Sequence, residues 1–308
     1  MIGYVVRRLL QFIPILIGLV TVLFALLNIL PGDPARMMAG PFANPDVVET
    51  IRQEMGFDRP LLVQYLDNLW NLARGEFGRS YQSRRPILKD MLEVFPKTFQ
   101  LALAAEITSA FIGIWLGVIA ATRRNGWADR LIMAVAALNL SFPLFWLALM
   151  LQIVFAVFLR MLPPSGYGAG FDRFIILPAF TLALPSLGLL ARITRAALLE
   201  VMGEDYIRTA RAKGLKATLI TRRHILPNAL IPIVTTIGTD FVRLLGGIPI
   251  IEVIFSWPGI GKYAYDALVF RDLPALQASV IILAVSVSLV NLVVDLLYAF
   301  INPRIRYV

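Results

Sequence analysis

The chain has 308 residues, of which 58% are hydrophobic and only 16% charged, and its mean hydropathy is +0.74. Soluble domains contain about 45–50% apolar and about 25% charged residues, so this composition indicates an integral membrane protein. Lys and Arg gathered on cytoplasmic loops explain the net charge of +9 without a nucleic-acid partner, and the absence of cysteine excludes thiol catalysis, disulfides and thiolate metal sites.

Long apolar runs predict an all-α fold with six transmembrane helices, because about 20 apolar residues cross a bilayer as a helix. The first run, Leu9 to Leu30, exceeds the about 7–15 residues of a signal peptide's apolar region, so we expect an uncleaved span. The third contains Pro143, which predicts a tilt or a kink. The predicted spans are residues 9–30, 100–122, 131–159, 174–191, 229–251 and 276–301.

Basic residues predict the orientation of these spans. With the N-terminus inside, the inner segments carry most of the Lys and Arg, including Arg7 and Arg8 at one end and Arg304 and Arg306 at the other. The short outer loops carry few. Because positive charge accumulates on cytoplasmic loops, we expect a multi-pass protein with both termini in the cytoplasm.

The long outer segment, residues 31–98, is expected to contain two short helices. One starts after Asn44-Pro45, a helix-capping pair, and ends at Gly56. The other covers the sequence LLVQYLDNLWNLAR and ends at Gly75. Two interpretations stay open: an extracytoplasmic cap that packs on itself, or a lid or docking surface at the outer mouth.

Small residues form one face of the second predicted span. Gly113, Gly117 and Ala121 follow at intervals of four, a pattern that lets two membrane helices approach closely. Most such faces pack within one subunit, and contact with a partner subunit is the alternative.

Charged residues inside the spans are candidates for function. Glu106, Asp240, Arg243 and Asp295 lie within predicted spans, and Glu252 lies near the end of one. Each costs about 2.5–3.5 kcal/mol at a helix centre, so each should face protein or a water-filled cavity. Asp240 and Arg243 share a helix face and either neutralise each other or line a translocation path with Glu252. Asp295 is interpreted as structural.

The sequence carries no recognisable catalytic set. Its one histidine, His224, stands at a span boundary without an orienting carboxylate. The sequence SWPGIGKY, residues 256–263, lacks the first glycine, the final Ser or Thr and the preceding strand of a phosphate-binding loop. We therefore predict that this chain is not an enzyme and binds no cofactor or metal, and that any ATPase is a separate polypeptide.

A basic segment, residues 192–227, separates the fourth and fifth predicted spans. Its first part, TRAALLEVMGEDYIRTARAKG, is rich in helix-forming residues and is predicted to be a helix that stops at its final glycine. Tyr206, Ile207, Ala210 and Lys213 share one face of that helix. It is either a solvated surface helix or a short cytoplasmic helix that inserts into a partner.

The spacing from Gly214 to Leu226 and Pro227 resembles the EAA loop of ABC-importer permeases. The general pattern is E-A-A, three residues, G, nine residues, I, one residue, L-P. Arg208, Thr209 and Ala210 occupy the E-A-A positions in this chain, and His224 stands at the isoleucine.

These departures fit the peptide/nickel branch of that family, and the resemblance extends over nearly the whole chain. It rests on EDYIRTARAKGL, HILPNA, RRLLQFIPILIG, LPGDPARMMAG, SFPLFWLAL, EVIFSWPGIGKYAYDAL and VDLLYAFINPRIRY. The sequence is most similar to the B-type dipeptide/oligopeptide permease subunits.

This resemblance implies a type I ABC-importer permease fold as one domain over residues 1–308. The protein would form the pore of an ATP-driven importer for di- or oligopeptides in a bacterial or archaeal cytoplasmic membrane, in contact with lipid. Its partners would be a second homologous permease, two ATPase subunits that hold Mg-ATP, and an extracytoplasmic substrate-binding protein.

Segment 192–227 would then be the coupling loop that contacts an ATPase. By position, the contacting residues would be Tyr206, Ile207, Arg208, Thr209, Ala210, Arg211, Gly214, Leu226 and Pro227. The alternative function is an ion-coupled secondary transporter or channel without ATPase partners, for which Asp240, Arg243 and Asp295 could supply an ion site.

Overall fold

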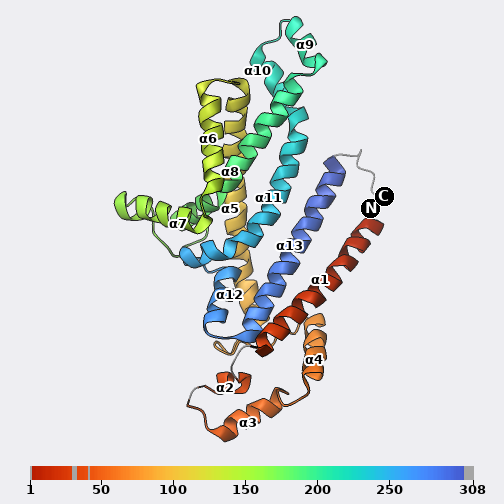
Figure 1. Cartoon of the computed structure of the whole chain (residues 1–308), viewed down its shortest axis with the longest axis vertical. Helices are drawn as coiled ribbons and strands as arrows, with labels where there is room; N and C mark the ends of the chain where they lie inside the picture. The colour runs from red at the N-terminus through yellow and green to blue at the C-terminus, as the bar shows by residue number, and fades with distance from the viewer. Residues whose placement is uncertain (1, 30–32, 41, 302–308) are drawn as a thin grey trace. The chain divides into compact units, whose positions relative to one another are not determined.

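The computed structural model describes residues 2–29, 33–40 and 42–301, which form helices and no β-strand (Figure 1). Arg304 and Arg306, used above for orientation, lie outside the described residues. In chain order the helices are α1 (Ile2–Ile29), α2 (Pro34–Ala39), α3 (Pro45–Glu54), α4 (Leu61–Ala73), α5 (Ile87–Thr122), α6 (Trp127–Ser141), α7 (Leu144–Leu151), α8 (Arg173–Met202), α9 (Asp205–Ala212), α10 (Ala217–Ile220), α11 (Leu226–Ile254), α12 (Ile260–Val269) and α13 (Leu273–Ile301). The π-helical segment η1 (Gln152–Phe158) continues α7, and η2 (Thr221–Ile225) leads into α11.

The number of predicted spans is confirmed when one bent pair of helices is counted as a single span. Within the described residues, 5 helices are long and apolar enough to cross a membrane, and α6 with α7 and η1 can supply a sixth. The polypeptide is therefore all-α and polytopic, as the sequence predicts.

The third predicted span, residues 131–159, is broken rather than kinked. The chain bends by 108° between Ser141 and Leu144. Phe142 has an extended backbone and Pro143 caps α7. A proline disfavours the helical conformation of the residue before it and supplies no backbone N–H, so the helix ends here and restarts in a new direction.

The helix that contains the second predicted span is longer than that span. Helix α5 starts at Ile87, inside the predicted outer segment 31–98. Ile87 and Met91 are buried against Ala275 and Ala278, so packing stabilises helical turns that the apolar run alone does not reach. The two short helices expected in the outer segment are confirmed as α3 and α4.

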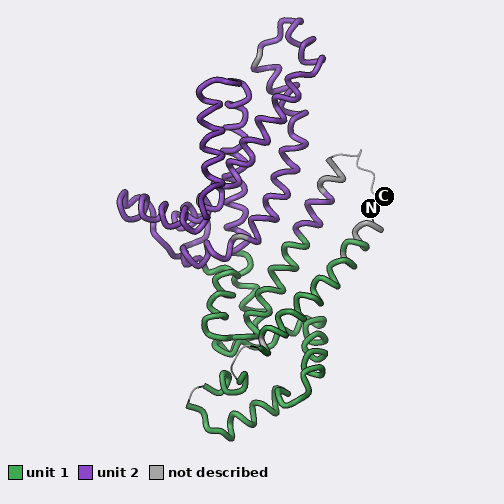
Figure 2. The backbone as a smooth tube through the Cα atoms, viewed as in Figure 1, with its two compact units in different colours: residues 1–96, 258–289 green, residues 97–257, 290–308 purple. Residues whose placement is uncertain are grey.

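The chain divides into two compact units (Figure 2). Unit 1 comprises residues 1–96 and 258–289, with α1 to α4, the start of α5, α12 and much of α13. Unit 2 comprises residues 97–257 and 290–308, with α6 to α11 and the greater part of α5. The single-domain organisation stays a prediction.

In unit 2, α8 is the central helix and packs against α6, α7 and α11. The predicted small-residue face of α5 packs against α8 of the same chain. A Cβ atom added at Gly117 would lie 2.5 Å from the Cβ of Thr194 and 2.7 Å from the carbonyl oxygen of Ala191. The absence of a side chain at Gly117 therefore permits the close approach of the two helices.

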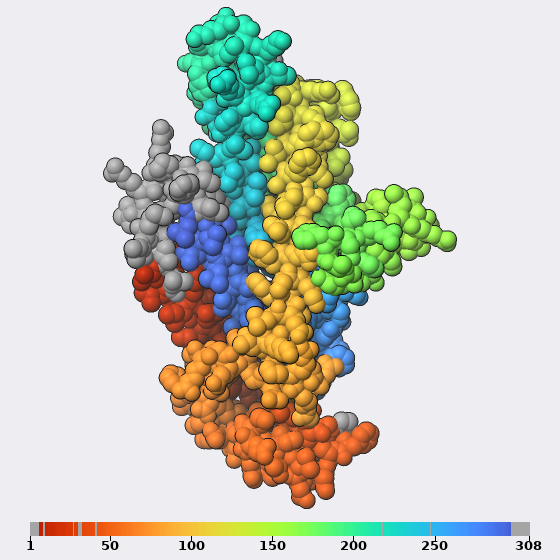
Figure 3. Space-filling model, turned by 180° about the vertical axis from the view of Figure 1, so that it is seen from behind, coloured from red at the N-terminus to blue at the C-terminus, as the bar shows by residue number. Residues whose placement is uncertain are grey.

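One face of α5 stays apolar and exposed. Phe99, Leu103, Ile107, Phe111 and Trp115 recur every four residues and form a stripe, which we call the α5 stripe. In Figure 3 this part of α5 runs along the visible surface in yellow to orange. Lipid or another membrane helix is the natural environment for such a face.

Gly117→Ala should destabilise unit 2 by about 1–3 kcal/mol, the usual cost of overpacking a tight core. The matched control is Gly246→Ala in α11, where an added Cβ meets nothing within 4 Å. Thermal unfolding of the purified protein in detergent should separate the two variants. Equal melting temperatures would contradict the close α5–α8 contact.

Candidate functional site

The helix predicted for TRAALLEVMGEDYIRTARAKG is divided in two in the structure, because its first part continues α8 and its second part forms α9. Helix α8 ends at Met202, Gly203 follows, and Glu204 has an extended backbone that starts α9. Glycine is a weak helix former, and Asp205 stabilises a new first turn through its negative charge. The break turns α9 away from the axis of α8, and α9 lies with α10 beyond the end of α8 (Figure 1).

Helix α9 is anchored to its own chain by the apolar residues of one face. Ile207 and Ala210 are buried in a cluster with residues at the ends of α5, α8, α10, η2 and α11. The buried members of this cluster, here called the α9 anchor, are Ala121, Ala197, Leu198, Ile207, Ala210, Ile220, Ile225, Ala229 and Ile233. The structure thus places Ile207 and Ala210 inside the protein rather than on a free surface.

The other side chains of α9 that the sequence analysis named are exposed. Tyr206, Arg208, Thr209 and Arg211 are all exposed, and we call these four residues the α9 surface. Arg208 pairs with Asp205 at 3.3 Å, but the two side chains are 74% and 94% exposed. Such a pair contributes about 0–1 kcal/mol, so it leaves Arg208 available to another partner.

The remaining residues of the EAA-like pattern delimit this helix and the next. Gly214 follows α9 with a φ of +74°, and an added Cβ there would meet nothing within 4 Å. Substitution at Gly214 would therefore strain the backbone without a steric clash. Leu226 packs against the α9 anchor, and Pro227 lies exposed in the first turn of α11.

Asp240 and Arg243 form an ion pair, which is one of the two interpretations of their spacing. The Nε and Nη2 atoms of Arg243 lie 2.8 Å and 2.7 Å from Oδ1 of Asp240. Nη2 also donates a hydrogen bond to Oγ of Ser186 on α8, at 2.9 Å. The pair therefore ties α11 to α8 within unit 2.

Glu252 does not join this pair. It is twelve residues along α11 from Asp240, about 18 Å at the rise of an α-helix. Its carboxylate is fully buried and accepts a hydrogen bond of 2.6 Å from Oγ1 of Thr98. Of the three pathway candidates, the structure brings Asp240 and Arg243 together and leaves Glu252 in a separate setting.

Sequence reasoning missed a second ion pair, between Asp129 and Arg195. Nε of Arg195 lies 2.6 Å from Oδ1 of Asp129, and Nη2 lies 2.8 Å from Oδ2. Asp129 is buried and also accepts a hydrogen bond from the backbone N–H of Asn125. The pair fastens the start of α6 to α8. The sequence shows an acidic residue at a helix start, but nothing in it identifies a partner 66 positions away.

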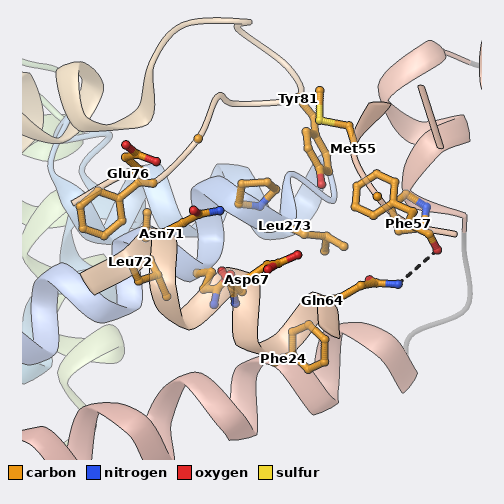
Figure 4. Close-up of a pocket in the computed structure, with 18 of the residues that line it drawn as sticks. Phe24, Met55, Phe57, Gln64, Asp67, Asn71, Leu72, Glu76, Tyr81 and Leu273 are labelled. Carbon is orange, nitrogen blue, oxygen red and sulfur yellow. Dashed lines mark hydrogen bonds between the residues drawn. The ribbon is translucent and has the colours of Figure 1, made fainter. Parts of the chain in front are cut away.

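Unit 1 contains a cavity of about 380 Å³ in the outer segment and its neighbours. It is lined by α1, α4, the start of α13 and the loops around Met55 and Tyr81. In Figure 4 the side chains of Asp67 and Gln64 and the hydroxyl of Tyr81 point into it, and Gln64 donates a hydrogen bond to the Phe57 carbonyl. Burial, and secondarily the negative charge of Asp272, raises the pKa of Tyr81, so its hydroxyl stays a hydrogen-bond donor.

Comparison with protein families finds two matches that together cover nearly all of the chain. Residues 113–307 match the family described as "Binding-protein-dependent transport system inner membrane component". Residues 1–102 match "Binding-prot-dependent transport system membrane comp, N-term".

Among curated proteins, the chain is similar to glutathione transport system permease proteins. The protein GsiC of Escherichia coli strain K12 is 43% identical over 307 residues, with 100% of both chains covered. GsiC of Salmonella typhimurium strain LT2 is 42% identical over the same length.

Two solved transporters share the fold. An inward-facing form of the MetNI methionine ABC transporter superposes with a TM-score of 0.60 at 19% identity, covering 71% of this chain and 99% of that one. An amino acid ABC transporter solved with histidines gives a TM-score of 0.50 at 18% identity, covering 71% and 95%.

Asp129→Ala should destabilise the protein by about 3 kcal/mol. The substitution removes the anion that pairs with Arg195, whose side chain is mostly buried. The double variant Asp129→Ala/Arg195→Ala should recover part of this loss. Thermal unfolding of the single and double variants measures the coupling. Strictly additive losses would show that the pair does not stabilise the α6–α8 contact.

Proposed function

Because the chain belongs to the family of inner membrane components of binding-protein-dependent transport systems, we propose that it forms the pore of an ATP-driven importer for small peptides. It is a transport subunit rather than an enzyme, a multi-pass inner membrane protein, and its fold is that of the type I ABC-importer permeases. We propose its cargo, its partners, its orientation in the membrane and the residues that couple it to ATP hydrolysis.

The relatives support a peptide-like cargo. Proteins that are 43% identical over the full length are named glutathione permeases, and glutathione is a tripeptide. We therefore place glutathione with di- and oligopeptides as the first substrates to test.

The proposed assembly contains a second homologous permease, two ATPase subunits and an extracytoplasmic binding protein. Mg-ATP would be held by the ATPases and by no site of this chain. The α5 stripe would be covered by lipid or by the second permease. With both termini in the cytoplasm, the basic α9 surface would face the ATPases.

The anchoring of α9 is the observation on which the coupling mechanism rests. Ile207 and Ala210 are buried with residues of α8 and α11, so a force on α9 is passed to both helices. An ATPase that grips the α9 surface differently in its two nucleotide states would shift the equilibrium between two arrangements of those helices. Ile207 and Ala210 would act as positioning residues, and the α9 surface would make the contact.

The second candidate function is ion-coupled transport without ATPases. Asp240 and Arg243 could serve it, but Arg243 already compensates the charge of Asp240 and donates a hydrogen bond to Ser186. The same two residues remain candidates for lining the path of an ATP-driven importer. Glu252, fully buried and bonded to Thr98, has a structural role in this proposal.

The deciding experiment is reconstitution of the chain in liposomes with a partner permease, the ATPases and the binding protein. Uptake that requires ATP and all four components, and ATP hydrolysis stimulated by glutathione or peptides, is the expected result. Uptake by the chain alone, driven by a proton or sodium gradient, would establish the second candidate instead.

Gly214→Val should uncouple ATP hydrolysis from transport while membrane insertion stays normal. A β-branched residue is strained at a φ of +74° by about 1–2 kcal/mol, so the backbone at the end of α9 should change its conformation. Gly214→Asn is the control, because asparagine tolerates this conformation. The measurement is transport per ATP hydrolysed, and full transport by the valine variant would refute the coupling role of the loop.

Arg208→Glu should weaken coupling about tenfold, equivalent to about 1.4 kcal/mol, if Arg208 meets an acidic ATPase surface. Lys216→Glu, another exposed basic residue just beyond α9, is the charge-matched control. Substrate-stimulated ATPase activity and ATPase co-purification should fall for the first variant only. A similar loss in both variants would indicate a non-specific charge effect.

A further inference from the structure

A buried carboxyl group in unit 2 has no hydrogen-bond partner. Glu106 on α5 is only 5% exposed, and neither of its carboxylate oxygens makes a hydrogen bond. Asp240 on α11 is 2% exposed, and its Oδ2 atom is also without a partner. The structure thus buries three unsatisfied carboxylate oxygens on two residues of adjoining helices.

These two carboxyl groups interact with each other. The charge of Asp240 acts most strongly on Glu106, and the charge of Arg243 acts on it less strongly. Arg243 is already bonded to Oδ1 of Asp240 and to Ser186, and its side chain is 55% exposed. One cation therefore compensates one of the two carboxylates.

An ionised pair would be costly in this setting. A second buried anion without a counter-ion is strongly destabilising, and like charges side by side add repulsion. A protonated carboxyl group is different, because it is neutral and has an O–H donor. That O–H group can donate the hydrogen bond that Oδ2 of Asp240 otherwise does not receive.

We propose that Glu106 and Asp240 form a proton-binding site inside the permease, with Glu106 as the acid and Asp240 as the acceptor. The proton makes the cluster of Glu106, Asp240 and Arg243 neutral overall. It also adds a bond from α5 to α11, which Arg243 already ties to Ser186 of α8. The site therefore joins three helices of unit 2 through polar contacts.

This site gives the proton a structural consequence. Helices α8 and α11 both contact the α9 anchor, so a change in their arrangement reaches Glu106 and Asp240. Separation of α5 from α11 would remove the acceptor from the acid and favour release of the proton. The charged groups that act on Glu106 are Asp240 and Arg243, both on α11, and α8 contributes the hydroxyl of Ser186.

The test is infrared spectroscopy of the purified full-length chain in lipid nanodiscs at neutral pH. The wild-type protein should show a protonated-carboxyl C=O band that shifts in D₂O and is lost in Glu106→Gln. The amide introduced by this substitution keeps a donor toward Asp240, so the variant should fold. Glu252→Gln, which changes another buried carboxyl group of unit 2, should retain the Glu106 band.

Two results would overturn the proposal. If the wild-type and Glu106→Gln spectra show the same carboxylic-acid bands, Glu106 is ionised. If the Glu106 band is abolished by sodium or potassium at constant pH, the site binds a metal cation rather than a proton.

A second measurement covers the case in which the band is obscured. The melting temperature of the wild-type protein should fall as the pH is raised and the proton is lost, because two adjacent buried anions remain. In Glu106→Gln, the decrease in melting temperature that comes from loss of this proton should be absent. Parallel pH profiles of the two proteins would contradict the proton site.

Discussion

A lipid bilayer provides no hydrogen-bonding partner for a polar group, and this constraint governs most features of the chain. Backbone groups are satisfied inside helices, and the apolar stretches are helical for that reason. Where Pro143 removes a hydrogen-bond donor, the helix stops, and the next helix begins after a bend of 108°. Charged side chains inside the spans are subject to the same constraint. Arg243 bonds to Asp240 and Ser186, Thr98 donates to Glu252, and Glu106 needs a proton to find a partner.

Helix α8 carries much of the resulting organisation of unit 2. It accepts the glycine face of α5, holds Asp129 of α6 through Arg195, and receives a hydrogen bond from Arg243 of α11 through Ser186. At its end, Leu198 enters the apolar cluster that anchors α9. In the proposed coupling mechanism, these contacts would pass a motion of α9 to α8 and from α8 to the other helices of unit 2.

The candidate coupling site was predictable in part from the sequence. Local sequence identified helical structure in this segment and its stop at Gly214, because helix propensity depends on neighbouring residues, but it did not reveal the break at Gly203. Which of its residues are buried was not predictable, since Ile207 and Ala210 are covered by residues of α5, α8, α10, η2 and α11, and this depends on how those helices pack. For the same reason the Asp129–Arg195 pair and the contact of Glu106 with Asp240 were missed. Each joins positions far apart in the chain, and one sequence does not reveal such pairs.

The sequence by itself determined that the protein is a helical membrane protein, roughly where its spans lie, and which segment resembles a coupling loop. Hydrophobic length, proline and glycine act locally, so their effects can be deduced residue by residue. Only the tertiary structure decided that α5 begins at Ile87, that α9 separates from α8 at Gly203, and which charges meet. Those outcomes depend on packing and desolvation, which arise only when distant helices come together.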